Sequence, residues 1–182
     1  NRLLSIRGIA ENYQILEIID QTQKSSKGIT VELCCPFFDE DYFAVVQRKA
    51  SREDLIIHGK LNREEFYQRL LESKVAISIP LSDSSPRSVY ESIYVGCIVI
   101  VRENPYVEDL PACMRDRLVV TDCSGDWLEV CYEEALRKAG TDFAPTHEAD
   151  LLFDQKLSFH RVVKCLPAEC HRDNLSRKKN VS

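Results

Sequence analysis

The chain has 182 residues, enough for one domain with a core of its own. Hydrophobic residues make up 44% and charged residues 29%, which is typical of a folded globular protein and excludes a disordered one. Its 24 lysines and arginines against 29 aspartates and glutamates give a net charge of −5, which excludes a domain held on nucleic acid by bulk positive charge.

Six short apolar runs predict β-strands. Several of them are continuous rather than alternating, as expected for strands that are covered on both faces in a parallel sheet. They are Leu3–Ile6, Ile29–Cys35, Leu55–His58, Val75–Pro80, Cys97–Val101 and Leu118–Thr121.

Stretches with helical spacing separate these strands. They are Tyr13–Gln23, Tyr42–Ala50, Arg63–Ser73, Val89–Val95 and Trp127–Ala139. Strand and helix in repeated alternation predict an α/β fold, a Rossmann-like doubly wound parallel sheet of about six strands. Ligands of such folds bind at the carboxyl ends of the strands, so we look for a site in the loops that follow them.

Three segments are expected along the chain. Residues 1–145 form the Rossmann-like domain, and residues 146–166 form a further helix, predicted at Glu148–Cys165 after a proline-containing linker. Residues 167–182 have little to bury, so we expect a flexible tail. The first strand starts at residue 3 without a lead-in, which favours a boundary inside a longer protein.

The sequence contains eight cysteines but no Cys-x-x-Cys pair. Cys34, Cys35, Cys97 and Cys131 lie in apolar segments, where a thiol acts as a small hydrophobe. The spacing of Cys165, Cys170 and His171 matches no common zinc site. We therefore expect free thiols and no metal. The apolar runs are far shorter than the roughly 20 residues of a membrane-spanning helix, and no signal peptide is evident, so we expect a cytoplasmic protein.

The segment Lys74–Pro105 carries the strongest signal of a binding site. Its strand ends at Pro80, a loop of small polar residues follows, and Ser85-Pro86 is predicted to open a helix with Ser85 as N-cap. The N–H groups at a helix start attract anions, and this start lies on the ligand edge of the sheet. The pattern indicates a ligand that carries phosphate.

Two acidic residues stand out in this segment, Asp83 in the loop and Glu91 in the helix. Each also has a plain structural explanation. Asp83 suits an Asx turn in a serine-rich loop, and Glu91 suits a surface ion pair with Arg87 four residues earlier. From these residues alone, both explanations remain open.

The combined pattern resembles the carboxyl-terminal half of retaining glycosyltransferases with the GT-B fold, family four in particular. That family carries a serine loop, an acid, seven residues and a glutamate, as in Ser82-Asp83-Ser84-Ser85-Pro86-Arg87-Ser88-Val89-Tyr90-Glu91 here. A helix, a glycine and an apolar strand follow, matched by Ser92–Ile100. Ser5-Ile6-Arg7-Gly8 and Ile57-His58-Gly59-Lys60-Leu61 resemble two upstream motifs, so the resemblance covers about residues 3–140.

The resemblance implies roles for the residues of the second motif. Asp83 would be the catalytic acid that lies against the donor sugar and stabilises the developing positive charge. Glu91 would accept hydrogen bonds from the ribose hydroxyls. The loop amides of Ser84, Ser85, Pro86, Arg87 and Ser88 would hold the sugar and the distal phosphate.

The upstream motifs would supply the rest of the donor site. Arg7 and Gly8 would face the diphosphate of a nucleotide-sugar, and Gly59 and Leu61 would line the base through main-chain contacts. The family usually has a lysine where this chain has Asn12, and a glycine is common where it has Tyr13. Lys60 or Arg87 is a candidate to replace the lost cation.

The resemblance therefore implies the donor domain of a hexosyltransferase-like enzyme that is inactive as this fragment. Its substrate would be a UDP- or GDP-sugar, with no metal and no cofactor. A glycan or lipid-linked acceptor would bind an amino-terminal domain outside these residues, and the larger enzyme could contact a membrane peripherally. We expect no nucleic acid partner.

One alternative is a non-catalytic nucleotide-binding or regulatory module of the same fold. Asn12 favours it, as does Asp83, which is one methylene shorter than the usual glutamate. A receiver-like signalling domain is a weaker alternative, because the acidic pair after the first strand is missing.

Overall fold

The computed structural model describes residues 1–34, 37–49, 55–59 and 61–154. The chain divides into two compact units, Asn1–Pro145 and Thr146–Ser182. The first unit contains all strands of the sheet.

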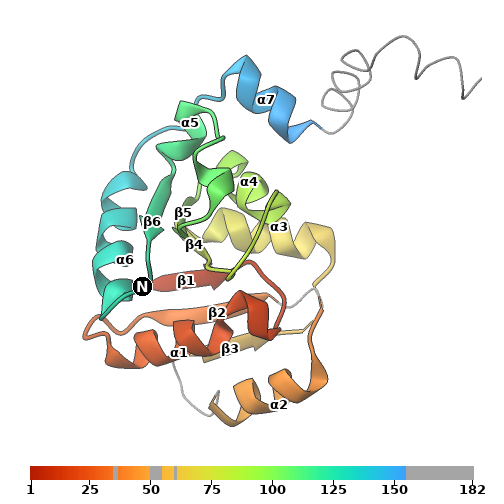
Figure 1. The fold of residues 1–182 in the computed structure, drawn as a ribbon, viewed down its shortest axis with the longest axis vertical. Coiled ribbons are helices and arrows are strands. Elements are labelled where there is room, and N and C mark those ends of the chain that lie inside the picture. Colours follow the sequence, from red (N-terminus) through yellow and green to blue (C-terminus); the bar gives the residue numbers. More distant parts are fainter. Residues whose placement is uncertain (35–36, 50–54, 60, 155–182) are drawn as a thin grey trace, which may run out of the picture. The chain divides into compact units, whose positions relative to one another are not determined.

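A six-stranded sheet, parallel throughout, forms the centre of the first unit (Figure 1). The predicted Rossmann-like α/β fold is thereby confirmed, and every predicted strand is present within two residues at each described end. The strands are β1 (Arg2–Ser5), β2 (Thr30–Cys34), β3 (Leu55–His58), β4 (Val75–Ser78), β5 (Ile98–Arg102) and β6 (Leu118–Thr121).

The strand order β3-β2-β1-β4-β5-β6 runs outward in both directions from the β1–β4 pair. Leu4 lies opposite Ala76 and Ser5 opposite Ile77 in that pair. In sheets of this order, the loops after the two central strands leave toward opposite faces and open a crevice between them. Arg7 follows β1 and Asp83 follows β4, so the fold places both beside that crevice.

Six helices accompany the strands in the described part of this unit. They are α1 (Ile15–Lys24), α2 (Glu40–Lys49), α3 (Arg63–Glu72), α4 (Arg87–Tyr94), α5 (Ala112–Arg115) and α6 (Trp127–Lys138), with 3₁₀ turns η1 (Glu11–Tyr13) and η2 (Pro105–Val107). The predicted helices are confirmed to within two residues at their described ends, whereas η1, η2 and α5 were not predicted.

Alternate residues of the strands face two different helix layers. One set packs with α1, α2 and α6, through buried side chains such as Ile18, Val46 and Leu128. The opposite face lies under α3 and α4, where Leu70, Val89 and Ile93 are fully buried (Figure 1). Strands covered on both faces explain why the apolar runs of the sequence are continuous.

Local backbone signals fix where two of the helices begin. Gln14 precedes α1 with φ 55°, a left-handed conformation, and its N–H donates to the carbonyl of Glu11. This turn delays α1 by two residues relative to the predicted start at Tyr13. The start of α3 has a capping box, in which the Asn62 side chain accepts from the Glu65 N–H and the Glu65 side chain from the Asn62 N–H.

The second unit contains α7 (His147–Phe153), whose N-cap Thr146 accepts a hydrogen bond from the N–H of Ala149. It begins one residue before the predicted helix Glu148–Cys165. The rest of that helix, the 167–182 tail, and Cys165, Cys170 and His171 lie outside the described residues. The part of the chain that is described has no helix long and apolar enough to cross a membrane.

Five cysteines lie in the described ranges, and none of these five is in a disulfide. Cys34, Cys97 and Cys131 are buried, as their apolar surroundings in the sequence predicted. Cys35 lies outside the described residues. In the described ranges, no three His, Cys, Asp or Glu side chains are grouped so that they could hold a metal.

Candidate functional site

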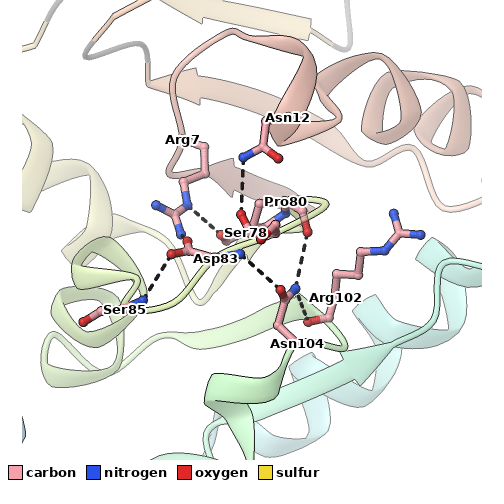
Figure 2. Close-up of polar contacts among 9 residues, drawn as sticks. Arg7, Asn12, Ser78, Pro80, Asp83, Ser85, Arg102 and Asn104 are labelled. Carbon is pink, nitrogen blue, oxygen red and sulfur yellow. Dashed lines mark hydrogen bonds and ion pairs between the residues drawn. The ribbon is translucent and has the colours of Figure 1, made fainter.

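Arg7 and Asp83 form an ion pair at the crevice between β1 and β4, where the fold predicts a ligand (Figure 2). The guanidinium also donates from Nε to the hydroxyl of Ser78 at 2.8 Å. The side chains of Arg7 and Asp83 are 14% and 16% exposed, so the pair is shielded but reachable from solvent. The sequence placed both residues at this edge but did not predict that they bind each other.

The loop that carries Asp83 is held from both sides. The Asp83 N–H donates to Oδ1 of Asn104 at 3.2 Å, and the Asn104 amide donates to the carbonyl of Pro80 at 3.3 Å (Figure 2). Asn12 accepts at its carbonyl from the Leu81 N–H at 2.9 Å, and its side chain donates to the carbonyl of Ser82 at 3.4 Å. The backbone around Asp83 is therefore fixed before any ligand arrives.

The start of α4 differs from the prediction by one residue. Pro86 is the N-cap, no side chain caps the helix, and α4 runs from Arg87. The predicted N-cap, Ser85, is wrong because the carbonyl of Pro86 accepts the first helical hydrogen bonds, from Val89 at 2.9 Å and Tyr90 at 3.2 Å. The Ser85 N–H donates to the Asp83 carboxylate at 3.3 Å, in the Asx turn that the sequence left open for Asp83. Ser85, two residues before the first residue of α4, still contacts Asp83 beside the crevice.

Aromatic side chains surround the Arg7–Asp83 pair. The Arg7 guanidinium lies 5.4 Å from the centroid of the Tyr13 ring, a cation–π distance. Burial is the main factor that raises the pKa of Tyr106, and the charges of Arg7 and Asp83 have smaller, opposite effects on it. Burial likewise raises the pKa of Tyr90, while its hydrogen bond with Ser85 lowers it. Both phenols therefore stay neutral beside the pair at physiological pH.

Next to this pair, a cavity of about 310 Å³ opens at the same edge of the sheet. Its lining comes from the ends of β1 and β2, the start of α3, and α4: Ile6, Cys34, Leu61, Asn62, Arg63, Phe66, Ser88 and Glu91. The cavity is mainly apolar, with a few polar groups, the composition of a site for a small molecule that has a flat, apolar part.

Glu91 is the shielded acid of this cavity, with a side chain only 12% exposed. Its Oε1 accepts from Arg87 at 3.2 Å, from Arg63 at 3.0 Å and from the Tyr67 hydroxyl at 3.1 Å. The Arg87 contact is the i,i+4 pair that was the plain explanation for Glu91. Two further contacts, from Arg63 and Tyr67 of α3, fix the Glu91 carboxylate in the wall of the cavity.

Ser88, on the same turn of α4, has a buried hydroxyl that has no hydrogen-bond partner in the described part of the chain. A buried hydroxyl without a partner is unfavourable by about 1–3 kcal/mol, so such a group calls for an explanation. Since Ser88 lines the cavity, a polar group of a ligand would satisfy it.

The site therefore has two clusters, the Arg7–Asp83 pair and the cavity that holds Glu91. The remaining predicted site residues that are described belong to neither cluster. Gly8 is buried, and a Cβ there would lie 2.7 Å from the carbonyl oxygen of Phe37. Ser84 is exposed, Pro86 is buried, and Gly59 is exposed with open space around it. Lys60, the candidate replacement cation, lies outside the described residues.

The residues at the site that were not predicted as such include Asn104, Tyr67, Arg63 and Ser78. Asn104 lies two residues after the end of β5, and an asparagine in the loop after a buried strand is a signal that the sequence carries. The i,i+4 spacing of Arg63 and Tyr67 shows that they share one face of α3. Which helix that face meets depends on the strand order, and the sequence does not state that order.

No family model and no curated protein matches the sequence. Solved structures do match its fold. HepE of Anabaena in complex with UDP-glucose aligns with a TM-score of 0.66 at 12% identity, over 91% of this chain and 49% of that one. The UDP-forming trehalose-phosphate synthase of Burkholderia vietnamiensis aligns with a TM-score of 0.58 at 12% identity, over 90% of this chain and 44% of that one.

The catalytic domain of the cholesterol-α-glucosyltransferase of Helicobacter pylori aligns with a TM-score of 0.56 at 14% identity, over 86% of this chain and 98% of that one. The chain spans about half the length of HepE and of the trehalose-phosphate synthase. The likeness confirms the predicted architecture, one Rossmann-like half of a GT-B fold. Sequence identities of 12–14% support a shared fold only. The chemistry of this chain depends on its own site residues.

Proposed function

We propose that this chain is the donor-binding domain of a retaining glycosyltransferase, which transfers a sugar from a nucleotide-sugar to a glycan or lipid-linked acceptor. The observation that carries the proposal is the pairing of two neighbouring clusters at one sheet edge. Arg7 and the start of α4 offer positive charge and amides for a diphosphate, with Asp83 paired to Arg7 beside them. The cavity next to this pair holds Glu91.

The two clusters suit the two ends of a nucleoside diphosphate. The apolar walls formed by Ile6, Leu61 and Phe66 suit a base, and Glu91 and Ser88 suit the hydroxyls of a ribose. Arg7 suits a phosphate, since a guanidinium binds phosphate oxygens in a bidentate manner. We assign Asp83 to the sugar side of the site, as the group that opposes the positive charge of the transition state.

The activity of the whole protein is part of the proposal. A domain that binds the acceptor would complete the cleft, so the isolated chain would bind donor but transfer no sugar. In the two-domain protein, Asp83→Asn would lower turnover by about two orders of magnitude, the scale of losing one positioned electrostatic group. Location in the cytoplasm and contact with a membrane surface are further parts of this proposal.

A second candidate function is a binding module of the same fold without catalysis. Asn12 favours it, because this residue takes the place of the family's lysine and braces the loop at Leu81 and Ser82 instead of offering a cation. Wild-type turnover in the Asp83→Asn variant of the two-domain protein would favour this second function.

The experiment that tests donor binding is calorimetric titration of the chain with UDP, GDP and ADP. We expect one of them to bind with a dissociation constant between about 1 μM and 1 mM, that is roughly −8 to −4 kcal/mol. Glu91→Gln should weaken that binding about tenfold, since a charged acceptor is lost. The matched control, Glu64→Gln on the exposed first turn of α3, should leave it unchanged. No binding of any of the three would contradict the proposal.

A further inference from the structure

Two residues of α3 reach across to the carboxylate of Glu91 on α4. The Arg63 guanidinium lies 3.0 Å and the Tyr67 hydroxyl 3.1 Å from the same oxygen, Oε1. Neither residue belongs to the motif that contains Glu91, since Arg63 lies 28 and Tyr67 24 positions before it in the chain. These contacts join two wall elements of the cavity at its acidic side chain.

The start of α3 is built so that Arg63 and Tyr67 have defined positions. The capping box between Asn62 and Glu65 fixes the first turn, and Arg63 is the first residue of the helix. Tyr67 lies one turn later, and its hydroxyl oxygen accepts from Arg63 Nε at 3.1 Å and from Arg63 Nη2 at 3.0 Å. The guanidinium carbon also lies 5.5 Å from the centroid of the Tyr67 ring.

The direction of the Tyr67 proton follows from these contacts. A guanidinium only donates, so the Tyr67 oxygen accepts from Arg63 and its own proton is directed to Glu91. Arg87 donates to the same Glu91 oxygen at 3.2 Å. Oε1 therefore receives three donors, and no donor from the described residues reaches Oε2. One oxygen of Glu91 is anchored, and the other keeps its lone pairs.

An anchored carboxylate differs from a free one in what a ligand must supply. Ordering a glutamate side chain costs rotamer entropy, and here the protein has already ordered it. Two vicinal hydroxyls can donate together to such an acceptor, because its lone pairs point in fixed directions. A single hydroxyl or the edge of a base makes only one such hydrogen bond, so an ordered carboxylate increases its affinity much less.

We propose that Tyr67 and Arg63 are positioning residues, which hold Glu91 so that its second oxygen receives the vicinal hydroxyls of a ribose. The proposal rests on the proposed function, since it assumes that a nucleotide occupies the cavity. It adds two residues outside the motif to the donor site, and it makes α3 a determinant of the preference for a ribose diol.

A purely structural role makes a different prediction for the same residues. If Tyr67 and Arg63 only tied α3 to α4, their loss would loosen the cavity and weaken every nucleotide alike. If they position Glu91, their loss would weaken only those nucleotides that present the diol. The ratio of affinities for a ribonucleotide and its 2′,3′-dideoxy analogue separates the two roles.

The experiment uses the whole chain and the nucleoside diphosphate among UDP, GDP and ADP that binds best, together with its 2′,3′-dideoxy analogue. The wild type should bind the ribonucleotide about 10- to 100-fold more tightly, since the analogue makes no bond to the charged acceptor. Tyr67→Phe should reduce that ratio about 3- to 10-fold, the loss expected for one hydrogen bond, with little change in the affinity for the analogue.

Two further variants keep the result interpretable. Arg63→Gln should also reduce the ratio, and it should fold normally, because the Arg63 side chain is 68% exposed. Tyr132→Phe is the matched control, since its hydroxyl donates at 3.1 Å to the carbonyl of Arg2, at the start of β1 and therefore at the opposite end of the strand from Arg7. It should leave the ratio at the wild-type value.

The possible outcomes are distinct. Equal weakening of both nucleotides in Tyr67→Phe and Arg63→Gln would overturn the positioning role and leave the proposed function standing. An unchanged ratio would overturn it as well. If the wild type binds none of the three nucleoside diphosphates, the proposed function fails, and the positioning role fails with it.

Discussion

Replacing Asp83 with asparagine should tighten the binding of a nucleoside diphosphate. The resemblance that identified Asp83 places it beside the sugar, which by itself predicts no effect on the diphosphate. The structure changes that expectation, because Asp83 is paired with Arg7, the cation that we assign to the phosphates. A phosphate on Arg7 would therefore meet the negative charge of Asp83 nearby.

Coulomb's law gives the size of this effect. A phosphate in contact with Arg7 would lie roughly 6–8 Å from the carboxylate, and at an effective dielectric constant of about 40 one charge pair at that distance repels by about 1 kcal/mol. The pair is 14–16% exposed, so part of this repulsion is screened by solvent and salt. Asp83→Asn should therefore bind the diphosphate about 3- to 10-fold more tightly.

Calorimetry at low and physiological salt measures this change directly. The matched control is Asp122→Asn in the loop after β6, where the carboxylate also accepts a backbone N–H, from Ser124 at 2.9 Å. The control should keep the wild-type affinity. Weaker binding by Asp83→Asn, at an unchanged melting temperature, would refute the reasoning, and it would mean that Asp83 helps binding by holding Arg7 in place.

Three other outcomes follow from particular contacts. Gly8→Ala should lower the free energy of unfolding by about 1–3 kcal/mol in urea denaturation, because the added Cβ meets the Phe37 backbone, whereas Gly140→Ala, with open space around it, should have a much smaller effect. Burial raises the pKa of the Cys97 thiol from 9.0 to about 12, so the folded protein should resist iodoacetamide at Cys97 at pH 9, as read by mass spectrometry. Because the unfolded thiol ionises first, this group should also make the fold less stable as pH rises from 9 toward 12, and early labelling of Cys97 would contradict both statements. Nucleotide binding should persist in EDTA, since Arg7 and the start of α4 would meet the phosphate charge, and a loss of about a hundredfold would point to a bound divalent cation instead.

The sheet could be predicted from the sequence because its strands are buried on both faces. Runs such as Val75–Ser78 and Ile98–Arg102 are continuous and short, a pattern that few other structures produce. The order of the strands could not be predicted, since pairing depends on contacts between distant parts of the chain. The start of α1 was misplaced for a local reason, the left-handed turn at Gln14.

The site could be predicted in its parts but not in its contacts. Arg7, Asp83 and Glu91 each follow or adjoin a central strand, so the sequence places them at one edge of the sheet. The pairing of Arg7 with Asp83 requires β1 to lie beside β4. The anchoring of Glu91 by Tyr67 requires α3 to lie beside α4. Both are consequences of strand order, and the sequence pattern carries no direct record of it.

The central claim is that one nucleoside diphosphate occupies both clusters at this sheet edge, and backbone amide shifts in NMR spectra would locate it. On titration of the ¹⁵N-labelled chain with the best binder among UDP, GDP and ADP, we predict the largest shifts at the amides of Gly8, Ser85 and Ser88. The amide of Tyr132, whose hydroxyl binds the start of β1, should not move. Saturable shifts that leave Gly8, Ser85 and Ser88 unmoved and lie elsewhere on the domain would contradict the claim.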